Sequence, residues 1–196
     1  CRVNFVMEYG NYGYRDEMTG ADYKTNRTNL EATMQRRMWH QNDPGVIPNL
    51  LITGRGAPTG ILVYEGNLLP EPFRNQMIHA EPGRNVVWAF PAKQVGAGYQ
   101  ASITNLVHSK GDLNYRPSDV SVAPDGSLII ADWFDPVDCC HRTVNDAGRI
   151  FRVAPPKHAY VVPDFDFKTP ADAAQALRNP NLSVRYKAWT AFQAMQ

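Results

Sequence analysis

Short apolar runs separated by turn residues occupy the middle of the chain, between about residues 50 and 153. Each run carries β-branched or aromatic residues and is bounded by Gly, Pro, Asn or Asp, which is the pattern of short β-strands. The predicted strands are residues 60–64, 76–80, 85–90, 100–107, 120–123, 127–132 and 149–153. The pattern therefore predicts a mainly β fold.

The predicted strands form an internal repeat. The run PTGILV at 58–63 resembles PSDVSV at 117–122, about 60 residues later, and a second run with a polar end follows each copy. A Gly-Arg pair then opens a third strand, at Gly83-Arg84 in one copy and Gly148-Arg149 in the other. Such a unit is typical of a β-propeller blade, whereas a β-sandwich with chance similarity is the alternative. Three matched elements in the same order favour blades.

The first 49 residues lack this alternation and are rich in Tyr and Asn. One helix is expected at 27–40, because Leu30, Met34 and Met38 recur every four residues. Asp43-Pro44-Gly45 would end it. We expect a long polar excursion at 1–49, ahead of blades at 50–153, so that residues 1–153 form a partial propeller.

The pattern of residues changes after residue 153. Prolines predict a stiff, extended linker at 154–168. Thr169-Pro170 predicts an N-cap and first helical position for a helix at 171–177, and Ser183 is expected to cap a second helix at 184–195. Two short helices cannot bury their apolar faces alone, so 169–196 is expected to begin a helical repeat.

Composition and charge exclude some classes of function. The formal net charge is +1 and apolar residues make up 43% of the chain, which fits a globular protein and argues against nucleic-acid binding. No apolar run approaches the roughly 18 residues of a transmembrane helix. The 3 cysteines do not suggest a disulfide framework. Because Cys1 stands where a Met would start a protein, we expect an excerpt from a longer chain.

Several segments resemble a known family. SVAPDGSLIIADWFDP from Ser121 and GRIFRVAPP from Gly148 resemble the last blade of the membrane-bound-dehydrogenase-like β-propellers of planctomycetes, a haem-binding family related to sorbosone and soluble glucose dehydrogenases. YGNYGYR from Tyr9 and APTGILVYEG from Ala57 fit the same family. NPNLSVRYKAWTA from Asn179 resembles the opening of its HEAT-type repeats. The resemblance implies the C-terminal blades of a β-propeller followed by a first HEAT-like repeat.

The resemblance also implies a function. The parent would be an exported, periplasmic quinoprotein-like dehydrogenase that oxidises a sugar, polyol or aldose and passes electrons to a c-type cytochrome module. Its haem c would be bound outside this chain, because Cys139-Cys140-His141 lacks the two-residue spacer of a haem attachment motif. The alternative is a non-catalytic propeller that binds carbohydrate or protein, with the HEAT repeats as an assembly surface. Fold alone does not decide between them.

The same resemblance implies pyrroloquinoline quinone and Ca²⁺ as cofactors. Arg116 stands where related enzymes place an arginine that holds the quinone carboxylates, and the alternative is an arginine paired with Asp112 or Asp119. His79 ends a blade strand at the funnel of the propeller, and is either a cofactor-binding residue or a structural histidine.

Three carboxylates suggest a metal site by their spacing alone. Asp132, Asp135 and Asp138 recur every third residue and could bind Ca²⁺ with nearby carbonyls, or could form Asx-turns at a strand end. Cys140 and His141 with Asp138 suggest Zn²⁺ more weakly, since a fourth ligand is missing. The aromatic residues Trp133, Phe134, Tyr115 and Trp88 could stack on a sugar or belong to the blade core.

Overall fold

The computed structural model describes residues 1–23, 39–41, 43–54, 56–134 and 147–195. The chain forms two compact units. Unit 1 comprises Cys1–Ala57 and Ala92–Ile103, and unit 2 comprises Pro58–Pro91 and Thr104–Gln196. Residues 92–103 therefore group with the N-terminal excursion, although they lie between two strands of unit 2 in the sequence.

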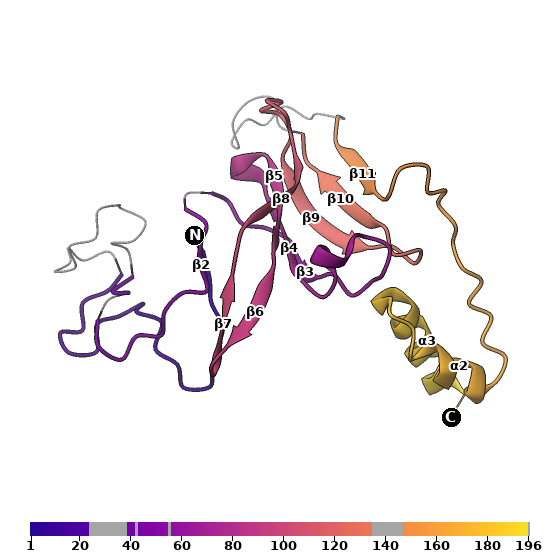
Figure 1. Cartoon of the computed structure of the whole chain (residues 1–196), viewed down its shortest axis with the longest axis horizontal. Helices are drawn as coiled ribbons and strands as arrows, with labels where there is room; N and C mark the ends of the chain where they lie inside the picture. Colours follow the sequence, from indigo (N-terminus) through magenta and orange to yellow (C-terminus); the bar gives the residue numbers. More distant parts are fainter. Residues whose placement is uncertain (24–38, 42, 55, 135–146, 196) are drawn as a thin grey trace. The chain divides into compact units, whose positions relative to one another are not determined.

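Unit 2 contains two antiparallel sheets of similar design (Figure 1). The first sheet has the order β3-β4-β5-β8, and the second has the order β11-β10-β9. In each sheet the strands pair in the order in which they follow along the chain, so each is a meander; the β6–β7 segment (residues 92–101) lies between β5 and β8 in the sequence. The strands are β3 (Ile61–Val63), β4 (Met77–Glu81), β5 (Val86–Phe90), β8 (Thr104–His108), β9 (Pro117–Val122), β10 (Leu128–Asp132) and β11 (Arg149–Val153).

The two sheets meet where β9, the first strand of the second sheet, contacts β3 and β4 of the first. The backbone N–H of Gly60 donates to the carbonyl of Ser118 at 3.3 Å. A Cβ at Gly60 would fall 2.8 Å from the Cα of Asp119 and 2.0 Å from its Oδ1, so a larger residue would force the two backbones apart. The hydroxyl of Thr59 lies 3.1 Å from the carbonyl oxygen of Ala80 and 3.4 Å from that of Pro117, and thus bridges the two sheets.

The core of unit 2 fills one face of the first sheet and continues into the second. Ile78 and Val87 on the first sheet, and Leu128 and Ile130 on the second, are fully buried. Tyr64 is also fully buried, and its hydroxyl donates to the carbonyl of Gly126 at 2.6 Å. The same oxygen accepts the N–H groups of Leu68 and Leu69, so a satisfied buried phenol ties the loop after β3 to the turn between β9 and β10.

The prediction of a mainly β chain is confirmed, and the predicted strand positions overlap β3, β4, β5, β8, β9, β10 and β11. One correction concerns residues 100–107, which were predicted as a single strand. They contain the end of β7 (Gly98–Ala101) and most of β8, in different sheets. The hairpin of β6 (Ala92–Val95) and β7 was not predicted, because AKQV carries little apolar signal. The closure of these sheets into a propeller stays a prediction.

The C-terminal helices are α2 (Pro170–Ala176) and α3 (Leu182–Ala194). Thr169 caps α2 as predicted, in a capping box with Asp172. The predicted cap of α3 is wrong: Asn181, not Ser183, is the N-cap, and its side chain accepts the N–H of Ser183 at 3.0 Å. Residues 154–168 contain no helix or strand.

Both residues at the start of α3 are engaged with the second sheet. The amide of Asn181 donates to the carbonyls of Ala123 and Pro124 at 2.9 Å each. The hydroxyl of Ser183 donates to the carbonyl of Val122 at 2.6 Å, which is why it is unavailable as a cap. The start of α3 is therefore fixed to the end of β9 and the turn that follows it.

Unit 1 has little regular structure. It contains β1 (Arg2–Val3) paired with β2 (Leu51–Ile52), the β6–β7 hairpin, and a bridge between Arg15 and Asp22. The helix predicted at 27–40 lies almost entirely outside the described residues, and its last two positions form a turn. No helix in the described parts of the chain is long and apolar enough to cross a membrane.

Candidate functional site

Arg116 lies at the entry of β9, where the two sheets of unit 2 meet. Its Nη1 donates to the carbonyl of Pro82 at 3.0 Å, and its backbone N–H donates to Oδ1 of Asp132 at 2.7 Å. Within the described residues, Nε and Nη2 of Arg116 have no partner, and the side chain is partly exposed. Neither of the two partners considered from the sequence, Asp112 or Asp119, is used. The guanidinium keeps two donors for an anion.

His79 lies on β4, three residues before Pro82. It pairs with Trp88 across the sheet, and it shares a face with Trp88 and Phe90, opposite the face that carries Ile78 and Ala80 into the core. The residue is 5% exposed. Burial lowers the pKa of His79, and the nearby carboxylate of Glu81 opposes this only in part. The imidazole is therefore neutral at neutral pH.

Two buried polar atoms on the segments around Arg116 have no hydrogen-bond partner in the described residues. They are Nδ1 of His79 and the hydroxyl of Tyr115. Tyr115 is 4% exposed, and burial together with the charge of Asp132 raises its pKa to about 12. Unsatisfied buried polar atoms cost free energy and are uncommon, so such atoms call for an explanation such as a ligand or an ordered water.

Asp132 ends β10 with its side chain buried and both carboxylate oxygens engaged. Oδ1 accepts the N–H groups of Arg116 and Phe134, at 2.7 and 2.9 Å. Oδ2 accepts Nε and Nη2 of Arg149, each at 2.6 Å. The guanidinium of Arg149 also lies over the Phe134 ring, 4.3 Å from its centroid. Asp132 is thus the centre of a charge-balanced hydrogen-bond network that holds the strand ends.

The remaining residues of the predicted metal sites follow Asp132 in the sequence. Asp135, Asp138, Cys139, Cys140 and His141 lie outside the described residues, so the calcium site at Asp132, Asp135 and Asp138 stays a prediction.

The four aromatic residues considered for sugar stacking do not form one surface. Tyr115 is buried against Phe151, and Trp88 donates from Nε1 to Asn105 at 2.9 Å. Phe134 lies beneath Arg149, and Trp133 is 56% exposed. These different environments favour structural roles for the first three.

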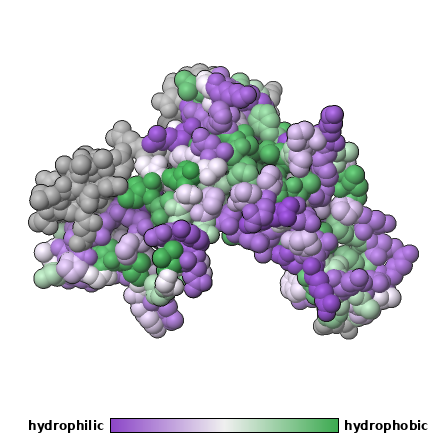
Figure 2. Space-filling view, in the orientation of Figure 1, coloured by the Kyte–Doolittle hydropathy of each residue, from purple (hydrophilic) through white to green (hydrophobic). Residues whose placement is uncertain are grey.

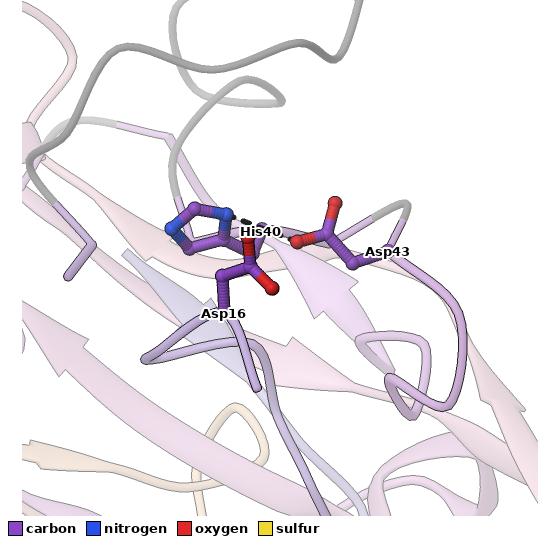
Figure 3. Close-up of side chains that lie close together, drawn as sticks. All are labelled: Asp16, His40 and Asp43. Carbon is purple, nitrogen blue, oxygen red and sulfur yellow. Dashed lines mark ion pairs between the residues drawn. The ribbon is translucent and has the colours of Figure 1, made fainter. Parts of the chain in front are cut away.

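Unit 1 contains a second cluster, which the sequence did not reveal. The side chains of Asp16, His40 and Asp43 point toward one another (Figure 3), and one ligand-type atom from each lies within 4.8 Å of the others. Nδ1 of His40 lies 3.0 Å from Oδ2 of Asp43, and Nε2 lies 3.0 Å from the carbonyl oxygen of Asp22. His40 is 5% exposed.

Tight turns hold the members of this cluster in place. Asp16 accepts the hydroxyl of Thr19 and the N–H of Met18, and these hydrogen bonds, in that order, lower the pKa of Asp16. His40 has a φ of 36° and follows Trp39, whose φ is 71°. The turn residues around 40–45 were the only sequence signal, and they predict a turn without indicating which side chains meet.

The chain is similar to one protein family and to a solved structure. Residues 11–157 match the family described as Domain of unknown function (DUF7133). No curated protein matches the chain. Among solved structures, the chain is similar to one from Thermus thermophilus described as an oxidoreductase (glucose dehydrogenase), with 16% sequence identity and a TM-score of 0.40. That similarity covers 57% of this chain and 29% of the other, so this chain spans well under two thirds of that protein. Because the family match spans most of its residues, the chain belongs to the DUF7133 family.

Proposed function

We propose that this chain supplies adjoining blades to a dehydrogenase-like β-propeller that oxidises a sugar, polyol or aldose. The observation that carries the proposal is the position of Arg116. Its guanidinium lies where β9, the first strand of the second meander, contacts β3 and β4 of the first, and Nε and Nη2 have no partner in the described residues. First strands line the central funnel of a propeller, where ligands bind.

The residues at this junction suit an anionic cofactor. A guanidinium binds a carboxylate through paired hydrogen bonds, and Arg116 is already held in place by the carbonyl of Pro82. Nδ1 of His79 and the hydroxyl of Tyr115, which have no hydrogen-bond partner in the described residues, lie on neighbouring segments and would be available to a ligand. These features fit pyrroloquinoline quinone, whose carboxylates Arg116 would hold and which, when bound, accepts hydride from the substrate carbon. The neutral imidazole of His79 would accept a hydrogen bond or a proton.

The calcium part of the proposal has a structural requirement. Oδ2 of Asp132 is paired with Arg149 at 2.6 Å in this structure. A calcium ion at Asp132, Asp135 and Asp138 would have to displace Arg149 from Oδ2. An exported parent protein with a cytochrome partner belongs to the same proposal and rests on the family resemblance in the sequence.

Quinone titration tests this function directly. Wild-type chain is titrated with pyrroloquinoline quinone, with and without Ca²⁺, and binding is followed by absorbance. We expect saturable binding that Arg116→Lys weakens about ten-fold or more, since the lysine keeps the charge and loses the planar fork. Arg178→Lys, an exposed arginine beyond α2, is the matched control and should bind as wild type does. No saturable binding, or equal affinity in the Arg116 variant, would contradict the proposal.

A second candidate is a non-catalytic propeller with an assembly surface. The observation in its favour is the fixed helical pair: α3 is anchored to the second sheet by Asn181 and Ser183, while Tyr186 and Trp189 are 63% and 49% exposed. Hydrophilic and hydrophobic residues are mixed on the face of the molecule seen in Figure 2. Absence of quinone binding in the titration above would favour this candidate.

A further inference from the structure

The cluster in unit 1 has the donor atoms of a transition-metal site. It offers two carboxylates, from Asp16 and Asp43, and the imidazole of His40. Mixed nitrogen and oxygen donors suit Zn²⁺, whereas Ca²⁺ and Mg²⁺ prefer oxygen alone. In the part of the chain that the structure describes, no other group of three such side chains is close enough to hold an ion.

The orientation of His40 is the first argument for a bound metal. Its Nε2 lies 3.0 Å from the backbone carbonyl of Asp22, which can only accept a hydrogen bond. Nε2 must therefore carry the proton, and in the neutral ring the lone pair is on Nδ1, which faces Asp43. A histidine that donates one N–H to a carbonyl and directs its other nitrogen toward carboxylates is oriented as metal-binding histidines are.

Distances are the second argument. Tetrahedral Zn²⁺ with bonds of about 2.0–2.1 Å separates its ligand atoms by about 3.3 Å. Nδ1 of His40 and Oδ2 of Asp43 are already 3.0 Å apart, and all three donor atoms lie within 4.8 Å. A small rotation of the Asp16 side chain would complete the set. Its hydrogen bonds from Met18 and Thr19 leave lone pairs on the carboxylate for a metal.

A cavity beside the cluster is the third argument, and it is independent of the contacts among the three residues. It has a volume of about 220 Å³ and is lined by both carboxylate residues, together with Arg15, Glu17 and Thr19. This space is large enough for several water molecules. Three protein ligands plus a water on an accessible side is the arrangement of an open zinc site.

From these observations we infer that Asp16, His40 and Asp43 bind one Zn²⁺ ion, with a water molecule from the cavity as the fourth ligand. The two carboxylates balance the charge of the ion, and the buried imidazole supplies the nitrogen donor. The ion would connect the turn around Asp16 to His40 and Asp43, in segments that the rings of Tyr14 and Trp39 also bring together, with centroids 5.2 Å apart. This site uses neither Arg116 nor His79, so the inference does not depend on the proposed function.

Calorimetric titration of the metal-free chain with ZnCl₂ tests the inference. We expect one binding site per chain, and at least about 100-fold weaker binding in Asp16→Asn and in Asp43→Asn, beyond the usual effect of losing an outer-shell contact. Glu17→Gln is the matched control, because Glu17 lines the same cavity and is not one of the three ligands. Its affinity should equal that of wild type.

Co²⁺ substitution keeps the test decisive if a variant does not fold. Wild-type chain with one equivalent of Co²⁺ should show the intense visible bands of a tetrahedral site, and Zn²⁺ should remove them. Circular dichroism of each variant shows whether it is folded. Absence of a stoichiometric Zn²⁺ site in wild type, bands typical of octahedral Co²⁺ only, or equal Zn²⁺ affinity in the folded Asp16 and Asp43 variants would overturn the inference.

Discussion

Different interactions stabilise the interior of each of the two units of this protein. Every buried hydrophobic side chain in the described residues belongs to unit 2, where Ile78, Val87, Leu128 and Ile130 form a continuous core. Among the described residues of unit 1, the buried side chain is the polar His40. Unit 1 contains a pair of two-residue strands, the β6–β7 hairpin, turn hydrogen bonds and contacts among the rings of Tyr14, Tyr23 and Trp39.

The stability of unit 2 therefore depends mainly on buried apolar area, whereas that of unit 1 depends on backbone conformation and hydrogen-bond geometry. Apolar burial contributes roughly in proportion to the area removed from water, and it tolerates changes of shape better than changes of volume. Contacts between turns depend on a few backbone conformations and on donor–acceptor pairs. Substitutions should therefore have different consequences in the two units.

The largest effect is expected for Leu128→Ala in unit 2. Leu128 is fully buried in β10, between β9 and β11, so truncation should lower the free energy of unfolding by about 3–5 kcal/mol. Ile150→Ala on β11, where the side chain is 72% exposed, is the control and should change it little. Denaturant melts of both variants measure the difference. A loss below about 1 kcal/mol at Leu128 would contradict a common core.

A smaller effect, confined to unit 1, is expected for Gly13→Ala. Gly13 has a φ of +74°, and a Cβ there would fall 2.2 Å from the carbonyl oxygen of Trp39. Left-handed strain and this overlap together should cost about 2–4 kcal/mol and displace the backbone that carries His40. Hydrogen exchange over residues 10–22 should report the change, while β4 and β10 stay protected.

Gly20→Ala is the matched variant for that experiment. Its φ of +72° is nearly the same, but nothing lies within 4 Å of the added Cβ. It should cost only the left-handed penalty of about 1–2 kcal/mol. Equal losses at the two glycines would mean that the contact between Gly13 and Trp39 does not matter.

The attachment of α3 to the second sheet should contribute less to the free energy of unfolding than the core of unit 2 does. Asn181→Ala removes a helix cap and two hydrogen bonds to the carbonyls of Ala123 and Pro124, and should cost about 2 kcal/mol. Thr169→Ala removes an exposed cap of α2 and should cost about 1 kcal/mol or less. Thermal melts compare the two, and a larger loss at Thr169 would show that the docking contacts of Asn181 contribute nothing.

The smallest effect is a pH dependence that arises from His79. Its pKa is lowered in the folded protein, so below pH about 6.5 the unfolded chain binds the proton more readily than the folded one. Its contribution to stability is thus complete above that pH and falls as the pH drops toward the folded pKa. His79→Gln should flatten the curve of unfolding free energy between about pH 7.5 and 5 relative to wild type. Parallel curves would show that His79 does not contribute.

Local chemistry explains how much of the fold was predictable from the sequence. Strands β3, β4, β5 and β10 combine apolar residues with flanking turn residues, and these signals act over a few positions. The capping box of α2 needs only Thr169 and Asp172, three residues apart. The sequence by itself therefore determined the mainly β class, most strand positions and the start of the first helix.

Tertiary structure decided everything that depends on distant residues. Asn181 rather than Ser183 caps α3 because Ser183 is already bound to Val122 on the second sheet. Asp132, for which the sequence allowed a calcium site or an Asx-turn, accepts the N–H of Phe134 and also lies in a network with Arg149 and Arg116. Asp16, His40 and Asp43 meet through turns, which carry no periodic signal, so spacing could not have paired them. The sequence sets what each short segment prefers, but the contacts that create a site form between segments whose separation carries no pattern.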